Sequence, residues 1–232
     1  GKLNGKYIRW YEGGIIKELD GEYLNNKKHK KWIYWSTNGQ KTEEINYDNG
    51  VHHGSHIKWF GEKSDQHKKF HINYKDGKKD GNWRHWYPSG FDSLKASYAN
   101  GEKDGHWIWW RKNGLKDKEG FYKKEKKHGL WTIWNDSTGR AYHKLHEETY
   151  VNDAIDGKVT KWYKEGGLDR QGIMRGKEKE GEWTYWERGG KRWLKFDYGD
   201  GLEKVTLGEI EERDGITFKI GKYEPYVGIV EE

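Results

Sequence analysis

Residues 80–113 read DGNWRHWYPSGFDSLKASYANGEKDGHWIWWRKN. This stretch contains one complete copy of a short unit and the beginning of a second copy. The unit opens with GNWRHW at 81–86, turns at PSG (88–90) and closes with YANG at 98–101. The opening then returns as GHWIWW at 105–110. The rest of the chain can therefore be searched for further copies of the same unit.

Alignment on the residue that opens each unit gives eight copies, separated by 25, 24, 27, 24, 24, 28 and 24 residues. A period of this length, sustained over most of a chain, predicts a repeat architecture in which each unit packs mainly on its neighbours. The opening residues are Gly5, Lys30, Gly54, Gly81, Gly105, Gly129, Gly157 and Gly181.

Three aromatic columns run through the eight copies. Position five after the opening residue is tryptophan in every copy: Trp10, Trp35, Trp59, Trp86, Trp110, Trp134, Trp162 and Trp186. Position two is more variable: Tyr7, Trp32, His56, Trp83, Trp107, Trp131, Val159 and Trp183. A third column, near the end of each copy, is tyrosine except once: Tyr23, Tyr47, Tyr74, Tyr98, Tyr122, Tyr150, Met174 and Tyr198.

Each unit reads as a β-hairpin. The segment between the opening glycine and the fifth position is rich in Trp, Tyr, Ile and Thr, which favour strands. Dipeptides such as Asn38-Gly39 and Asn113-Gly114 follow it, and these suit a hairpin turn that needs positive φ. We predict an all-β fold, an elongated single-sheet solenoid of about eight tandem antiparallel hairpins over residues 1–201. Strand-like segments in 202–232 predict a C-terminal β cap, which would protect an open sheet edge.

Side chains alternate across a strand, so positions two and four are expected on one face and positions three and five on the other. Unless a β-bulge changes the register, both faces carry aromatic rings. A single-layer sheet then needs curvature, hairpin loops or a partner to cover these rings.

The composition is unusual for a folded chain, with 35% charged and 32% hydrophobic residues, but the aromatic share is 16%. We expect the fold to be held by Trp and Tyr, which bury large areas. Cysteine is absent, which excludes disulfides and thiolate chemistry. The net charge of +6 comes from mixed-sign turns, typical of a solvated rim. No apolar run is long enough to predict a transmembrane segment.

The chain begins in a pattern that matches a repeat's closing turn, since residues 1–7 align with residues 101–107. We therefore expect that upstream residues were removed, by processing of a targeting segment among other routes. This expectation favours a secreted or cell-envelope location, with a cytoplasmic location as the alternative.

The pattern D-G-x-W-x-x-W-Y-x-x-G followed by Y-x-N-G-x-x-x-G, seen at 80–90 and 98–105, resembles the bacterial variant of the MORN repeat. The resemblance covers residues 1 to about 201, with Lys30 in place of glycine as a departure. It implies a β-hairpin array that acts as an interaction module. Proteins of this variant are often labelled antitoxin components or occur at bacterial surfaces, and eukaryotic relatives are associated with phospholipids and scaffolding. The family has no shared catalytic residues.

We searched the sequence for catalytic and metal-binding patterns and predict none, and we predict no cofactor. The sequence has no G-x-S-x-G motif, phosphate loop or Cys–His pair. Several histidines occupy turns that carry Asp or Glu in other copies, which indicates polar turn filling rather than zinc ligation. These histidines are His29, His52, His53 and His128.

The unbroken tryptophan column at position five indicates structural packing, because a requirement of stability recurs in every unit. The variable column at position two and its neighbours at position four are better candidates for contact with a partner, since Trp and Tyr are enriched in interface hot spots. The predicted partner-binding residues are Trp83, His85, Trp107, Trp109, Trp131 and Tyr185.

The leading hypothesis is a noncatalytic module that binds another protein, as an antitoxin, an immunity protein, a surface adhesin or a scaffold. The net charge of +6 counts against neutralisation of a basic nuclease. The alternative is binding of acidic phospholipid or glycan through stacked rings with Lys and Arg at the rim. Nucleic acid is the least favoured partner, because basic residues do not cluster.

Overall fold

The computed structural model describes residues 1–61, 67–136 and 142–198, together with the backbone of four short strands between 203 and 231. Every regular element in these ranges is a β-strand, so the predicted all-β class is confirmed. The longer hairpin loops of the third and sixth copies fall in part outside the described residues.

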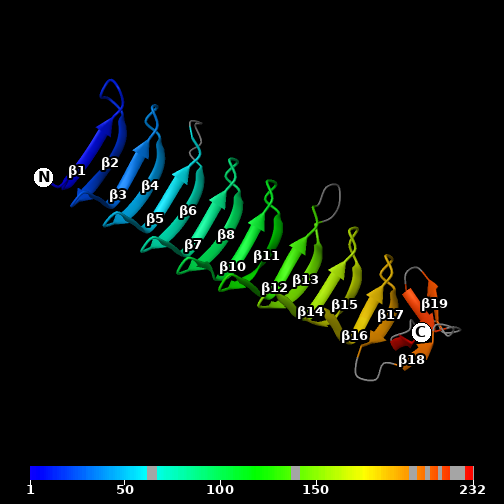
Figure 1. Ribbon diagram of the computed structural model, residues 1–232. Helices are drawn as coiled ribbons and strands as arrows, with labels where there is room; N and C mark the ends of the chain where they lie inside the picture. The colour runs from blue at the N-terminus through cyan, green and yellow to red at the C-terminus, as the bar shows by residue number, and fades with distance from the viewer. Residues whose placement is uncertain are drawn as a thin grey trace. The chain divides into compact units, whose positions relative to one another are not determined.

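The chain divides into two compact units, Gly1–Lys126 and Lys127–Glu232. Within each unit, consecutive hairpins pair antiparallel along an open sheet, with the hairpin turns at one edge and the turns between copies at the other (Figure 1). The strands of the first unit are β1 (Gly5–Trp10), β2 (Lys17–Leu24), β3 (Lys27–Trp35), β4 (Lys41–Asp48), β5 (Val51–Trp59), β6 (Lys68–Lys75), β7 (Lys78–Trp86), β8 (Asp92–Ala99), β9 (Glu102–Lys103), β10 (Gly105–Trp110) and β11 (Lys116–Lys123).

The second unit continues the same hairpins and ends in short strands that form separate two-stranded sheets. Its strands are β12 (Lys126–Trp134), β13 (Lys144–Val151), β14 (Ala154–Trp162), β15 (Leu168–Arg175), β16 (Glu178–Trp186), β17 (Arg192–Asp197), β18 (Glu203–Thr206), β19 (Ile210–Arg213), β20 (Ile216–Lys219) and β21 (Gly228–Glu231). Strand β18 pairs parallel with β21, and β19 pairs antiparallel with β20. Strands therefore exist in the predicted C-terminal segment, and its role as a cap stays a prediction.

Each hairpin has the same register. The opening glycine pairs with the tyrosine column, as Gly105 does with Tyr122, and a bulge follows position four, between Trp109 and Trp110. The extra residue of the bulge lies in the second strand, so alternation along the first strand is preserved. Positions two and four therefore share one face, which we call face A. Positions three and five share the other, which we call face B.

The opening position has a backbone reason for glycine. Gly5, Gly54 and Gly81 have φ values of 91°, 88° and 83°, a region that glycine enters without steric cost. Lys30 takes the same place with φ 57°, at a cost of roughly 1 kcal/mol for an L-residue. The repeat tolerates this departure because the backbone conformation, not the side chain, is what the position requires.

Candidate functional site

Several rings of position two on face A belong to the core. Trp32, Trp107 and Trp183 are only 1%, 4% and 2% exposed. Each donates its indole N–H to a main-chain oxygen ten residues earlier, at 3.1 Å to Glu22, 3.1 Å to Ser97 and 2.9 Å to Ile173. A buried donor with a partner avoids a desolvation penalty, so this bond fixes the ring as well as satisfying it.

Two of these rings lie directly on a glycine of the preceding strand. A Cβ atom added at Gly21 would stand 2.3 Å from Trp32 Cδ2, and one at Gly172 would stand 2.2 Å from Trp183 Cδ2. These two glycines are needed for close approach of a ring, since neither has the positive φ of the opening positions. The residue beneath the ring thus decides how deep the ring sits.

Trp83 is an exception that supports this explanation. Its indole nitrogen is buried without a hydrogen-bond partner, and so is Nε2 of the neighbouring His85. The residue opposite Trp83 on the preceding strand is Ile72, where Trp32 has Gly21. A branched side chain at this place leaves no room for the ring to reach the backbone oxygen that the other tryptophans use.

The structure separates the predicted partner-binding residues into two groups. Trp107 and Trp131 are 4% and 5% exposed, so they belong to the core and a partner would meet little of either ring. The assignment of the six residues to a partner-binding surface stays a prediction. The other predicted residues are half-buried on face A: Trp83, His85, Trp109 and Tyr185.

The tryptophan column at position five lies on face B and is less buried than position two. Its exposure runs from 9% at Trp134 to 46% at Trp10, and the other members are half-buried. Its main chain links neighbouring hairpins, because the hydroxyl of Tyr87 donates to the Trp110 oxygen at 2.7 Å and that of Tyr163 to the Trp186 oxygen at 2.6 Å. At this column, neighbouring hairpins are therefore joined by hydrogen bonds to the main chain as well as by ring packing.

Sequence reasoning missed a column of lysines two residues before the opening position. Each ammonium lies over the position-two ring of its copy and the next tyrosine of the third column. Lys79 Nζ is 4.0 Å from the Trp83 ring and 4.9 Å from the Tyr98 ring. These distances are within cation–π range. We call each set a lysine cage; the lysines are Lys28, Lys79, Lys103, Lys127 and Lys179.

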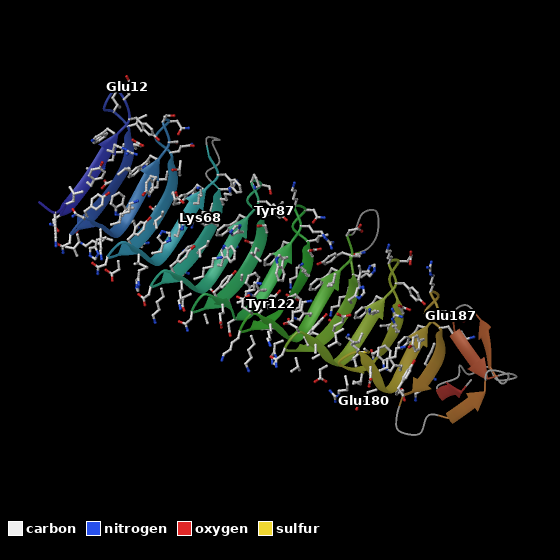
Figure 2. The ribbon with its side chains drawn as sticks, viewed as in Figure 1. Glu12, Lys68, Tyr87, Tyr122, Glu180 and Glu187 are labelled. Carbon is white, nitrogen blue, oxygen red and sulfur yellow. The ribbon has the colours of Figure 1, made fainter. Side chains whose placement is uncertain are left out.

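The cages lie toward the edge of the sheet where one copy passes to the next. Figure 2 shows Tyr122, a ring of the Lys103 cage, away from the hairpin-turn edge at which Tyr87 lies. A column with a constant offset from the opening glycine was visible in the sequence. From sequence alone, these lysines are grouped with the charged turns, because a lysine in a turn usually points into solvent.

The electrostatics of the cages keep lysine charged and tyrosine neutral. Burial lowers the pKa of Lys28, but the hydrogen bond from its ammonium to the Tyr34 hydroxyl at 2.8 Å and the nearby tyrosines outweigh this, so the pKa is raised overall. Burial raises the pKa of Tyr98 to about 12. The rings therefore present neutral π faces to a fixed cation.

Most caged lysines have no carboxylate partner. Among the described residues, only Lys103 of the five forms an ion pair, with Glu125 at 3.3 Å. Two carboxylates on face A are used elsewhere, because Glu43 bonds His56 at 2.8 Å and Glu148 accepts from the Tyr150 hydroxyl at 2.6 Å. Among the described residues, Lys28, Lys79, Lys127 and Lys179 therefore lie over rings of face A without a carboxylate partner.

No group of three or more His, Cys, Asp or Glu side chains within the described ranges is placed to hold a metal ion. Those ranges also contain no helix that could cross a membrane.

No family model matches the chain, and no curated protein matches it closely enough to be counted as similar.

Proposed function

We propose that this protein is a noncatalytic binding module and that face A binds an acidic segment of a partner protein. The observation that carries the proposal is that Lys28, Lys79, Lys127 and Lys179 have no carboxylate partner in the part of the chain that the structure describes. The cages hold each ammonium at a fixed place on a sheet, so little side-chain entropy is lost when an anion binds.

The half-buried rings beside the cages supply the rest of the interface. Trp109 and Tyr185 stand at position four, next to the buried rings of their copies, and expose part of their area on face A. Rigid aromatic side chains flanked by cations are typical of interface hot spots. The charge pattern selects an acidic partner, because complementary charge favours encounter and disfavours basic competitors.

The biological roles proposed for such a module are an antitoxin, an immunity protein, a surface adhesin or a scaffold. Support for these comes from the resemblance to MORN repeats and from the hairpin architecture. An acidic partner surface also agrees with the basic net charge of +6, which disfavours neutralisation of a basic nuclease.

The second candidate ligand is an anionic lipid headgroup, because a caged ammonium can also meet a phosphate. A single titration series distinguishes the two. Intrinsic tryptophan fluorescence is followed while poly-L-glutamate, vesicles containing phosphatidylserine, or single-stranded oligothymidylate is added at low and at physiological salt.

The decisive variants share the same net charge. In the first, Lys28, Lys79 and Lys127 are changed to Met, which fills each cage without a charge. In the control, the adjacent exposed lysines Lys27, Lys78 and Lys126 are changed to Met. Circular dichroism verifies that both variants are folded.

We expect poly-L-glutamate to bind the parent chain and the control variant, and to lose at least tenfold in affinity for the cage variant. Equal loss in both variants would show that net charge alone attracts the polyanion, and the proposal would fail. Binding to vesicles without binding to poly-L-glutamate would replace the protein partner with lipid.

A further inference from the structure

Face B has a pocket of about 500 Å³ in the first unit, between the fourth and fifth copies. It lies over β7, β8 and β10 and is lined by Asn82, Arg84, Lys95, Ser97, His106 and Ile108, with parts of two other residues. Asn82 and Arg84 alternate with Trp83 and His85, so the pocket opens on the face opposite the lysine cages. It is therefore independent of the surface proposed above.

Face B carries the same ion pair in the first, second, fifth and sixth copies. A lysine at the start of the second strand pairs with a carboxylate three residues later, as Lys17 does with Asp20 at 2.8 Å, Lys41 with Glu44 at 2.8 Å and Lys116 with Glu119 at 2.9 Å. The bulge brings the two residues together on one face. The lysine thus neutralises the carboxylate that stands beside the next strand.

The fourth copy reverses this order at the pocket. The acid comes first, as Asp92, and the cation three residues later, as Lys95, with 3.7 Å between Oδ2 and Nζ. In addition, Arg84 occupies position three, where Ile8, Ile33, Ile57 and Ile108 stand in other copies of this unit. Arg84 and Lys95 are direct cross-strand partners, an arrangement of like charges that costs stability unless an anion lies between them.

Asp92 is such an anion, but it is hydrogen-bonded to Arg84 and not to Lys95. Its two oxygens accept from Arg84 Nε at 2.6 Å and Nη2 at 2.9 Å. Lys95 lies beyond hydrogen-bond distance of Asp92, and its ammonium has no acceptor among the described side chains. One carboxylate thus faces the two cations. A second carboxylate, Glu119, lies 3.5 Å from His106 and is itself paired with Lys116 at 2.9 Å.

Further donors around the pocket are uncommitted. The side chains of Asn82 and Ser97 are direct cross-strand partners, and neither forms a side-chain hydrogen bond with a described residue. Arg84 lies over the Trp86 ring at 4.9 Å and Lys95 over the Trp110 ring at 5.4 Å, so each cation rests on an aromatic side wall. An amide, a hydroxyl and an ammonium therefore border one pocket, whose wall also contains Ile108.

We infer that this pocket is a binding site for a small ligand that carries a phosphate or sulfate group. Lys95 supplies the charge, the Asn82 amide and the Ser97 hydroxyl supply hydrogen bonds, and Arg84 adds its free Nη1. An oxyanion with several acceptor oxygens satisfies these donors together, because charge-assisted hydrogen bonds to such groups are the strong ones. The anion also relieves the repulsion between Arg84 and Lys95.

The test is calorimetric titration of the full chain with inorganic phosphate, inorganic sulfate and glucose 6-phosphate. The main variant exchanges the two charges, Asp92→Lys with Lys95→Glu, which gives the order of Lys116 and Glu119 in the fifth copy without changing net charge. This variant places a carboxylate opposite Arg84, so we expect its thermal stability to equal or exceed that of the parent. The control is the same exchange in the second copy, Lys41→Glu with Glu44→Lys.

We expect saturable binding of at least one of the three probes to the parent chain and to the control, and a loss of at least tenfold in the Asp92/Lys95 exchange. Preference for glucose 6-phosphate over the inorganic ions would identify an esterified ligand as the source. The variant with Met at Lys28, Lys79 and Lys127 should bind the probe as the parent does, because those residues lie on face A. No saturable binding, or equal affinity in the Asp92/Lys95 exchange, would overturn the inference.

Discussion

The seventh and eighth copies, both in the unit Lys127–Glu232, have different residue types at the same three positions of face A. In the eighth copy, Lys179 lies over the rings of Trp183 and Tyr198 at 5.1 and 5.0 Å. In the seventh, the same three places hold Ile155, Val159 and Met174, which pack in one apolar cluster. The strand register and the bulge are the same in both.

Between these two copies, the residues of the three columns change together. An ammonium buried among aliphatic side chains loses its hydrating water and gains no favourable interaction in return. Over aromatic faces, cation–π attraction compensates for part of the lost hydration. In the seventh copy the lysine and both rings are replaced together by apolar residues, whereas the first copy has Leu3 at the lysine position and keeps Tyr7 and Tyr23. The lysine cage is therefore part of the core as well as a surface charge.

The largest expected effect on stability comes from a change beneath the Trp183 ring of the eighth copy. Gly172→Ala places a Cβ 2.2 Å from the Trp183 ring, and the ring must move from its hydrogen bond to Ile173. We expect destabilisation of about 3 kcal/mol in chemical denaturation. Gly189→Ala is the control, because nothing lies within 4 Å of the added atom and its φ is ordinary. Equal effects of the two changes would contradict this account of ring depth.

A smaller effect is expected when the cation is removed from the same copy. Lys179→Ile puts the residue of the seventh copy into a cage of rings and removes hydrogen bonds to the hydroxyls of Tyr185 and Tyr198, at 2.8 and 3.1 Å. We expect a loss of about 1.5 kcal/mol in the free energy of unfolding. The nearby exposed Lys177→Ile should cost much less. A stabilising result for Lys179→Ile would show that apolar packing alone sets the core.

A still smaller effect on stability is expected at the hydrogen bond that joins the seventh copy to the eighth. Tyr163→Phe removes the donor to the Trp186 oxygen and leaves the ring in place. We expect a cost of about 1 kcal/mol, measured as a shift of the denaturation midpoint without a change in slope. An unchanged midpoint would mean that water replaces the hydroxyl without penalty.

The smallest effect at neutral pH concerns the third copy, where the cage lysine is replaced by His52. Burial, and secondarily the charge of His56, lower the pKa of His52. The unfolded chain therefore binds the proton first, and stability that is present above the unfolded pKa of about 6.5 is lost as the pH falls through it toward the folded value. Glu43 opposes the shift, and Lys28 adds to it.

Thermal unfolding between pH 7.5 and pH 5 measures this dependence. His52→Lys should flatten the part of the profile that His52 contributes, because lysine stays charged in both states over this range. His71, His85 and His146 also have pKa values lowered by burial, so a residual slope remains. An identical profile in the variant would show that His52 does not titrate differently on folding.

The hairpins could be predicted because their signals are local. Each signal determines the conformation of a few residues: a glycine at positive φ, a strand of aromatic and β-branched residues, and an Asn-Gly turn. The same signals recur along the eight copies. The two strand faces could also be assigned, because the bulge adds its residue to the second strand and leaves alternation in the first strand intact.

Which aromatic column is buried could not be predicted from the column itself, since Trp107 and Trp110 are the same residue type on opposite faces. Burial depends on the residue beneath the ring, one strand earlier, as Gly172 beneath Trp183 and Ile72 beneath Trp83 show. A comparison of these cross-strand pairs, copy by copy, would have found the signal. The lysine column, the centre of the candidate site, was also visible, but its direction over the rings follows only from the three-dimensional structure.

The most direct test of the central claim is a nuclear magnetic resonance measurement of the lysine Hε protons at Lys28, Lys79, Lys127 and Lys179, assigned through single Lys→Arg variants. Protons over an aromatic face are shielded, so we predict upfield resonances for these four lysines and ordinary positions for Lys27, Lys78 and Lys126. Addition of poly-L-glutamate should shift the resonances of the first group selectively. Ordinary positions for all seven would contradict the cages, and with them the account of the core and of the binding face.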